Sequence, residues 1–128
     1  MKLYRSGEDY LKAILILEGQ NDSVRSLDVA EYLHFSKPSV SKAMKLLQEG
    51  GFLTMDKDKH LHLTPLGKEA AESVFEKHSV LYEALLAIGV TPEAAEKDAC
   101  EIEHVISEEA FAQVKAFLSR WGGARSPA

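Results

Sequence analysis

The sequence predicts a mostly α-helical protein with one small β-hairpin, built as two successive domains. Apolar residues recur at helical spacing through most of the 128 residues, whereas residues 52–64 alternate apolar and polar side chains. Charge also differs along the chain, because residues 1–68 carry 10 Lys and Arg against 9 Asp and Glu and the remainder carries 5 against 11. We therefore expect one domain over 1–68, a second over 69–121 and a disordered tail over 122–128.

Size and composition are those of an ordinary globular protein, with 45% hydrophobic residues. No apolar run approaches the roughly 20 residues that a membrane-spanning helix needs, and the N-terminus lacks the apolar region of a signal peptide. The single cysteine excludes an intrachain disulfide. We expect a cytoplasmic protein without a membrane partner.

Two helices are predicted in the first 34 residues. Ser6 is the N-cap candidate of the first helix, which ends at Gly19. Ser26 is the N-cap candidate of the second, shorter helix. The apolar residues expected in the core are Tyr10, Ile14 and Leu17 in the first helix and Leu27, Ala30 and Leu33 or Tyr32 in the second.

A third helix follows a tight turn, with Ser36 as N-cap and Pro38 in its first turn, where proline is tolerated. Its core positions are Val40, Met44 and Leu47. A short helix, a turn and a second helix with a polar, basic start form a helix-turn-helix pattern. The alternating segment 52–64, with the charged tip "DKDK", predicts a hairpin. A hairpin in this place is a wing, so the first domain is predicted to be a winged helix-turn-helix.

Three further helices are predicted in the second domain. Thr64 and Pro65 begin a long helix that ends at Gly89, and Thr91 with Pro92 begin the next. Ser107 caps the last helix. Its apolar stripe could serve as core or as a dimer face, and consists of Ala110, Phe111, Val114, Phe117 and Leu118.

The start of the third helix carries hydroxyl and lysine side chains that suit DNA. Such groups at a helix N-terminus can bind phosphates and reach base edges in the major groove. Lys57 and Lys59 of the wing could contact the flanking backbone. A solvated helix face and a solvated hairpin tip are the alternative interpretation. The candidate DNA-binding residues are Ser36, Lys37, Pro38, Ser39, Lys42, Lys57 and Lys59.

The stretch "DACEIEHVIS" gathers possible metal ligands at residues 98–107. On a helix, Cys100, Glu103 and His104 share one face because they stand at i, i+3 and i+4. A thiolate, a carboxylate and an imidazole form half of a transition-metal shell. Asp9 and His78, on polar faces of other helices, are candidates for the remainder. The alternative is a buried cysteine beside a solvated Glu–His pair.

The chain resembles the diphtheria toxin repressor family of metal-dependent transcriptional repressors, which includes a manganese transport regulator branch. The resemblance covers most of the chain. The chain is similar to the short, two-domain members of the family, which lack the C-terminal SH3-like domain. The stretches that carry it are "EDYLKAILIL", "VAEYLHFSKPSVSKAMKLLQEGGFL", "LTPLGKEAA", "EKHSVLYEALLAIGV" and "DACEIEHVIS".

The resemblance implies a role for individual residues. Asp9, Cys100, Glu103 and His104 match positions of metal ligands, and His78 matches the histidine of an accessory site. Lys12 and Tyr82 stand where the family has further carboxylate ligands. A protonated ammonium cannot bind metal. The resemblance therefore implies one well-formed site and a weak second site near His78 that uses Glu96 or Glu83. The recognition positions carried over are Ser36, Pro38, Ser39 and Lys42.

The predicted function is a repressor that binds operator DNA as a homodimer when loaded with a divalent transition metal. The Cys100 thiolate favours Fe(II) over Mn(II), although Asp9 is a hard ligand. Three alternatives stay open: an oxidant sensor acting through Cys100, a metalloenzyme and a structural zinc protein. The acidic neighbours of Cys100 disfavour a reactive thiolate. No nucleophile or phosphate-binding glycine loop is evident, so we expect no enzyme and no small organic substrate.

Overall fold

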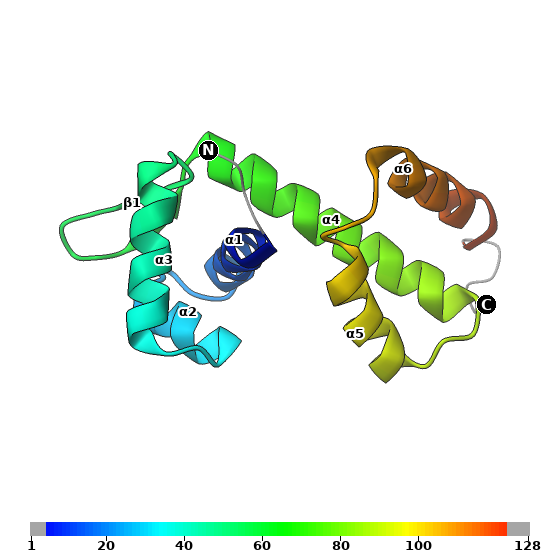
Figure 1. Ribbon diagram of the computed structural model, residues 1–128, viewed down its shortest axis with the longest axis horizontal. Helices are drawn as coiled ribbons and strands as arrows, with labels where there is room; N and C mark the ends of the chain where they lie inside the picture. Colours follow the sequence, from blue (N-terminus) through cyan, green and yellow to red (C-terminus); the bar gives the residue numbers. More distant parts are fainter. Residues whose placement is uncertain (1–4, 123–128) are drawn as a thin grey trace. The chain divides into compact units, whose positions relative to one another are not determined.

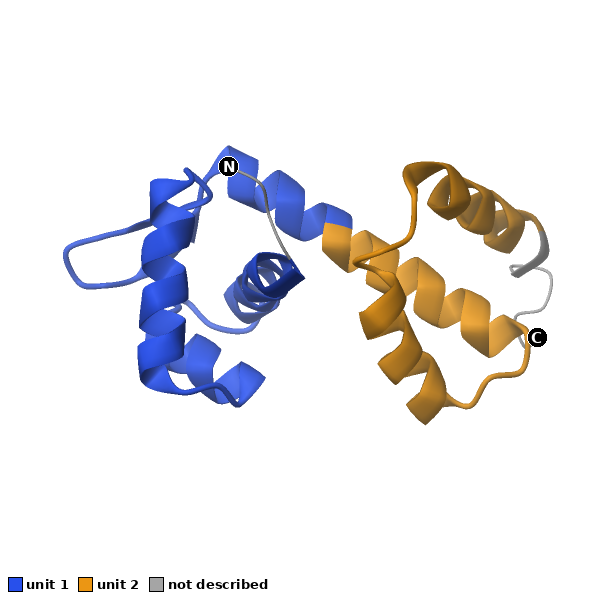
Figure 2. Cartoon of the chain, viewed as in Figure 1, with its two compact units in different colours: residues 1–73 blue, residues 74–128 orange. Residues whose placement is uncertain are grey.

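The computed structural model describes residues 5–122 and divides the chain into two compact units (Figures 1 and 2). The units are residues 1–73 and 74–128, so their boundary falls within the long helix α4 (Pro65–Ala87). The disordered tail that we predicted over 122–128 lies outside the described residues, except for Gly122. Among residues 5–122, no helix is long and apolar enough to cross a membrane.

The first unit is a helix-turn-helix followed by a two-stranded wing, as the sequence predicts. In chain order it contains α1 (Arg5–Glu18), α2 (Ser26–Leu33), α3 (Lys37–Glu49), β1 (Leu53–Met55), β2 (Leu61–Leu63) and the start of α4. Between α2 and α3, His34 adopts the left-handed conformation that ends α2 and turns the chain. The predicted fold class, mostly α with a small β wing, is confirmed.

The starts of the first two helices differ from the prediction. Ser6 lies inside α1, which already includes Arg5. Ser26 is the first residue of α2, and Arg25 takes the N-cap position. There the carboxylate of Asp28 accepts a hydrogen bond of 2.8 Å from the backbone N–H of Arg25. Asp28, in the first turn of α2, therefore stabilises the N-terminal end of this helix through its side chain.

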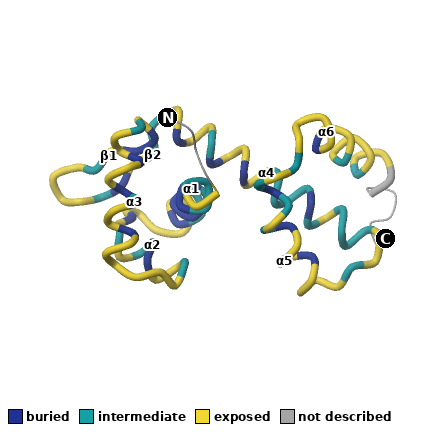
Figure 3. The backbone as a smooth tube through the Cα atoms, in the orientation of Figure 1, coloured by how far each residue is buried: buried dark blue, intermediate teal, exposed yellow. Residues whose placement is uncertain are grey.

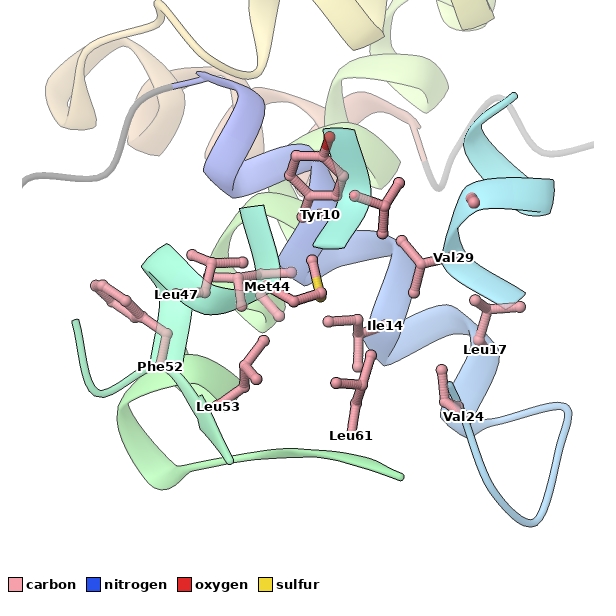
Figure 4. Packing of buried hydrophobic residues seen from close by; sticks show 14 residues of the cluster. Tyr10, Ile14, Leu17, Val24, Val29, Met44, Leu47, Phe52, Leu53 and Leu61 are labelled. Carbon is pink, nitrogen blue, oxygen red and sulfur yellow. The ribbon is translucent and has the colours of Figure 1, made fainter. Parts of the chain in front are cut away.

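The core of the first unit lies where α1, α2, α3 and the wing meet (Figure 4). The predicted core residue Leu27 of α2 is 45% exposed instead. Of the two alternatives Leu33 and Tyr32, Leu33 packs against the core, whereas Tyr32 is 44% exposed. Val29, which the prediction omitted, is fully buried beside Ala30. The predicted core positions of the other two helices are all buried: Tyr10, Ile14, Leu17, Val40, Met44 and Leu47.

The wing is an antiparallel pair in which Thr54 lies opposite His62 and Met55 opposite Leu61. Leu61 is buried and His62 is exposed, as the alternating pattern predicts. Asp56 directly follows β1, and its side chain accepts hydrogen bonds of 2.9 Å from the backbone N–H groups of Asp58 and His60. Backbone hydrogen bonds from Asp56 to His60 and from Lys59 to Asp56 also close the turn, which forms without an Asn-Gly or Asp-Gly pair.

The first turn of α4 packs tightly on the segment before the wing. The Thr64 hydroxyl donates to the Gly51 carbonyl at 2.6 Å and accepts from the Gly67 N–H at 3.1 Å, so it caps α4. A Cβ on Gly67 would lie 1.8 Å from the carbonyl oxygen of Phe52. Only glycine permits this approach, and α4 is thereby fixed to the wing.

The second unit contains the rest of α4, α5 (Pro92–Ile102), α6 (Glu108–Phe117) and a π-helical turn at Leu118–Gly122. Thr91 and Ser107 cap α5 and α6 as predicted, accepting from Ala94 and Ala110. Lys77 of α4 contacts Glu108 at 2.7 Å, and Lys115 of α6 contacts Glu76, so ion pairs join α4 to α6.

In the second unit, buried positions are interspersed with exposed ones along each helix (Figure 3). Ala95 and Ala99 of α5 have no exposed surface, which brings the backbone of this helix close to its neighbours. In α6, Phe111 is buried whereas Phe117 is 59% exposed. Of the predicted apolar stripe of α6, Phe111 is therefore buried, Val114 and Leu118 are half-buried, and Ala110 and Phe117 are exposed.

Candidate functional site

The metal-ligand candidates after Cys100 lie on a turn rather than on a continuous helix. We predicted one helical face for Cys100, Glu103 and His104, but α5 ends at Ile102. Glu103 is the C-cap, and the N–H groups of Val105 and Ile106 both bond to the Ile102 carbonyl. Glu103 keeps a helical backbone, with its N–H bonded to the Ala99 carbonyl at 3.0 Å, and its carboxylate contacts His78 of α4.

His78 of α4 lies between two carboxylates. Its Nδ1 is 2.7 Å from Oε1 of Glu103, and its Nε2 is 2.9 Å from Oε2 of Glu96. A neutral imidazole carries one N–H and can donate to only one of these acids. Both ring nitrogens of His78 therefore face a carboxylate oxygen.

Cys100 adds a thiol to the same cluster. Its Sγ lies 3.8 Å from Nδ1 of His78, and ligand atoms of His78, Glu96 and Cys100 all lie within 4.8 Å of one another. Nitrogen and sulfur ligands bound to one zinc at roughly 2.0 and 2.3 Å are separated by a similar distance at tetrahedral angles. The donor set of imidazole, carboxylate and thiol therefore fits a divalent transition metal.

Glu103 joins His78 to His104. While its Oε1 faces His78, its Oε2 lies 3.3 Å from Nε2 of His104. The Glu103 side chain has no exposed surface, and that of His104 is 3% exposed. A carboxylate that is removed from water in this way needs a cationic or hydrogen-bonding partner on each oxygen. The structure thus brings four predicted ligands of the second unit into one chain of contacts: His78, Cys100, Glu103 and His104.

Two of the second-site candidates differ in their surroundings. Glu96 contacts His78, whereas Glu83 belongs to none of the groups in which three possible ligand atoms of the described residues lie within 4.8 Å. Tyr82 places its ring parallel to the imidazole of His78, at a centroid separation of 6.5 Å. Of the two candidates, the structure therefore brings only Glu96 into printed contact with His78. Asp9 is half-buried on α1 in the first unit.

The candidate DNA-binding residues of α3 are all exposed at its N-terminal end. Ser36 caps the helix by accepting from the Ser39 N–H at 3.3 Å, and its hydroxyl donates to the Ser39 hydroxyl at 2.8 Å. Pro38 stands in the first turn, Lys37 lies between the two serines in the chain, and Lys42 follows Ser39 by three residues. The two hydroxyls are therefore held in a defined orientation on an open, basic helix end, where phosphates and base edges can be contacted.

Lys57 and Lys59 are exposed at the tip of the wing. They alternate with Asp56 and Asp58, so the formal charges of the tip cancel. Sequence reasoning treated this tip only as a lysine-bearing loop. The backbone hydrogen bonds of Asp56 show that its aspartates are organised as well.

Both units match models of known domains. Residues 2–61 match the iron dependent repressor N-terminal DNA-binding domain, and residues 64–121 match the iron dependent repressor metal binding and dimerisation domain. The chain belongs to the iron-dependent repressor family. The family supplies the context for both clusters, because the exposed α3 surface falls in the DNA-binding match and the His78–Cys100–Glu103 cluster in the metal-binding match.

Individual members of the iron-dependent repressor family are similar over most of this chain. Transcriptional regulator MntR of Salmonella typhimurium is 35% identical over 115 residues, which cover 90% of this chain and 73% of the relative. The iron-dependent repressor IdeR of Mycobacterium tuberculosis is 34% identical over 109 residues, 84% of this chain and 47% of the relative. The chain therefore spans about half the length of the latter.

Solved structures of the family share the fold. The manganese regulator SloR superposes with a TM-score of 0.79 at 28% identity, covering 93% of this chain and 55% of that chain. A manganese-dependent transcriptional repressor in complex with manganese gives 0.80 at 27% identity, with coverages of 88% and 52%. These relatives are transcriptional regulators, a class that acts by binding DNA and not by catalysing a reaction.

Proposed function

We propose that this protein is a repressor that binds operator DNA as a homodimer when its second unit holds Fe(II) or Mn(II). Residues 1–68 read the DNA, and residues 69–121 bind the metal and form the dimer. The matches to a DNA-binding domain and to a metal-binding and dimerisation domain support this division. An oxidant sensor acting through Cys100 gains no support from the family.

The placement of His78 between Glu96 and Glu103 carries the proposal. Two carboxylates and a thiol surround one imidazole in a partly buried place, and these are oxygen, sulfur and nitrogen donors that divalent transition metals bind. A bound divalent cation offsets the negative charge of the two carboxylates. Without one, the acids repel each other, so the local structure is expected to be less stable.

We assign the ligands as His78, Cys100, Glu103 and His104 of the second unit, with Asp9 of the first unit. Glu96 is assigned to a second, weaker metal site at His78. The contacts among the second-unit residues support their part of the assignment. The role of Asp9 rests on its match to a ligand position of the family. A ligand from each unit explains how metal binding and DNA binding can be coupled.

Fe(II) is the metal that we favour over Mn(II). A thiolate is a softer ligand than a carboxylate and prefers iron to manganese. The relatives support both metals, because an iron-dependent repressor and manganese regulators are each similar to this chain. Cys100 is therefore the residue on which the preference depends.

The coupling is tested by measuring the affinity of the full chain for promoter fragments from its own genome, anaerobically. The measurements are made in chelator, with Fe(II) and with Mn(II), on the wild type, Asp9→Ala and the control Glu18→Ala. Glu18 is exposed at the end of the same helix as Asp9. We expect metal to strengthen binding by the wild type and the control and to have little effect on Asp9→Ala.

Two results would contradict the proposal. Equal affinity in chelator and in metal would leave a DNA-binding protein without metal control. Loss of DNA binding on treatment with an oxidant, with Asp9→Ala behaving like the wild type, would favour the thiol sensor instead. The homodimer is checked on the same samples by analytical ultracentrifugation.

A further inference from the structure

The tip of the wing carries four possible metal ligands that the proposed function does not use. In "DKDKHLH", Asp56, Asp58, His60 and His62 stand at every second position. Asp56, Asp58 and His60 lie in the turn between the strands, and His62 lies in β2. Ligand atoms of Asp56, Asp58 and His60 all lie within 4.8 Å of one another.

Two imidazoles converge on one carboxylate oxygen of this tip. Nε2 of His62 lies 3.0 Å from Oδ2 of Asp56, and Nδ1 of His60 lies 3.6 Å from the same oxygen. Ligands bound at roughly 2.0–2.2 Å to one zinc are separated by about 3.0–3.5 Å at angles between 90° and tetrahedral. The His62–Asp56 pair therefore already has this spacing, and the His60–Asp56 pair lies close to it.

The other oxygen of Asp56 holds the carboxylate in place. Oδ1 accepts from the N–H groups of Asp58 and His60, both at 2.9 Å, so Oδ2 stays directed at the two imidazoles. Hydrogen bonds that orient a ligand in this way are typical of metal sites.

We propose that the wing tip binds one divalent transition cation through Asp56, His60 and His62, with Asp58 as a fourth ligand. Imidazole nitrogens together with carboxylate oxygens select zinc, cobalt or nickel in preference to magnesium or calcium. This site lies wholly in the first unit and is independent of the ligands around His78.

Occupancy would change the charge of the wing. Two aspartates and two lysines cancel at residues 56–59, so a divalent cation leaves this segment with two net positive charges. Positive charge next to Lys57 and Lys59 strengthens attraction to phosphate. This consequence rests on the proposed function, whereas cation binding at the wing does not.

The test is a titration of the full chain with cobalt(II), which reports the two sites by different signals. Cobalt bound by Cys100 gives a sulfur-to-metal charge-transfer band, whereas the wing offers only nitrogen and oxygen. The variants are the pair His60→Gln with His62→Gln, and the control His34→Asn, which removes an exposed histidine of the same unit. Asparagine tolerates the left-handed conformation of His34.

We expect the double variant to bind one equivalent of cobalt fewer than the wild type and the control, with an unchanged thiolate band. An equal number of equivalents in the double variant would overturn the proposal. In the wild type, paramagnetic cobalt should also broaden the imidazole NMR signals of His60 and His62, and their persistence at saturation would overturn it as well. A missing thiolate band with broadened wing histidines would instead contradict the proposed site at Cys100.

Discussion

Oε1 of Glu103 lies 2.7 Å from Nδ1 of His78, although 25 residues separate them along the chain. The contact joins the turn after α5 to the middle of α4 and leaves the Glu103 side chain without exposed surface. The second oxygen of Glu103 faces His104. One carboxylate thus connects two histidines, and most of the candidate metal centre depends on it.

Replacement of Glu103 by glutamine should weaken metal binding strongly. The substitution keeps the size of the side chain but removes the charge between His78 and His104. We expect affinity for Mn(II) to fall about 10- to 100-fold, as for other groups that support a metal. Equilibrium dialysis measures this, with Glu101→Gln as the control because Glu101 is exposed two residues earlier. An equal loss of affinity in both variants would show that the negative charge of this region, and not a specific contact of Glu103, determines metal binding.

Replacement of Cys100 by aspartate should shift the metal preference toward Mn(II). The change substitutes a hard carboxylate for a soft thiolate at a position 3.8 Å from His78. The ratio of Mn(II) to Co(II) affinity, measured by competition with a chromophoric chelator, is expected to rise. A ratio equal to that of the wild type would mean that Cys100 is not a ligand.

Lys42→Ala should reduce the salt dependence of DNA binding. If Lys42 contacts one phosphate, its loss lowers the slope of log affinity against log salt concentration by about 1 and weakens all DNA sequences alike. Fluorescence anisotropy at several salt concentrations gives the slope. Lys68→Ala is the control, since Lys68 is an exposed lysine of the same unit outside the predicted surface. Identical slopes for the wild type and Lys42→Ala would exclude the contact.

Gly67→Ala should destabilise the first unit by about 1–3 kcal/mol, the usual range for overpacking. The added Cβ would lie 1.8 Å from the Phe52 carbonyl oxygen, so α4 would have to move from the wing. Urea unfolding measures the change. Gly19→Ala is the control, because its Cβ would meet its nearest neighbour, the Ile16 carbonyl, at 3.4 Å. Similar stabilities of the two variants would contradict the close approach.

Asp56 should contribute stability that is lost in acid. The hydrogen bond from His62 is the largest cause that lowers its pKa from 3.8 to about 2. A carboxylate with a depressed pKa stabilises the fold above its unfolded pKa, and this contribution disappears as the pH falls through the folded pKa. In chelator, the difference in unfolding free energy between the wild type and Asp56→Asn should therefore shrink between pH 3.8 and about 2. A difference that stays constant over this range would exclude the ionised carboxylate as its cause.

Local signals in the sequence determined much of the first unit. Ser36 as N-cap, Pro38 in the first turn and the spacing of Val40, Met44 and Leu47 predicted α3 correctly, because caps and helical periodicity act within a few residues. The alternation around the wing likewise predicted the hairpin and the burial of Leu61.

Only the tertiary structure decided which apolar face of α2 is buried and how the metal-ligand candidates meet. Val29 and not Leu27 enters the core, because α1 and α3 determine which side of so short a helix is covered. Periodicity placed Glu103 on the same helix as Cys100, whereas α5 ends before it and its carboxylate contacts His78 from α4. Contacts between residues far apart in the chain depend on packing, and a pattern read along one helix cannot supply them.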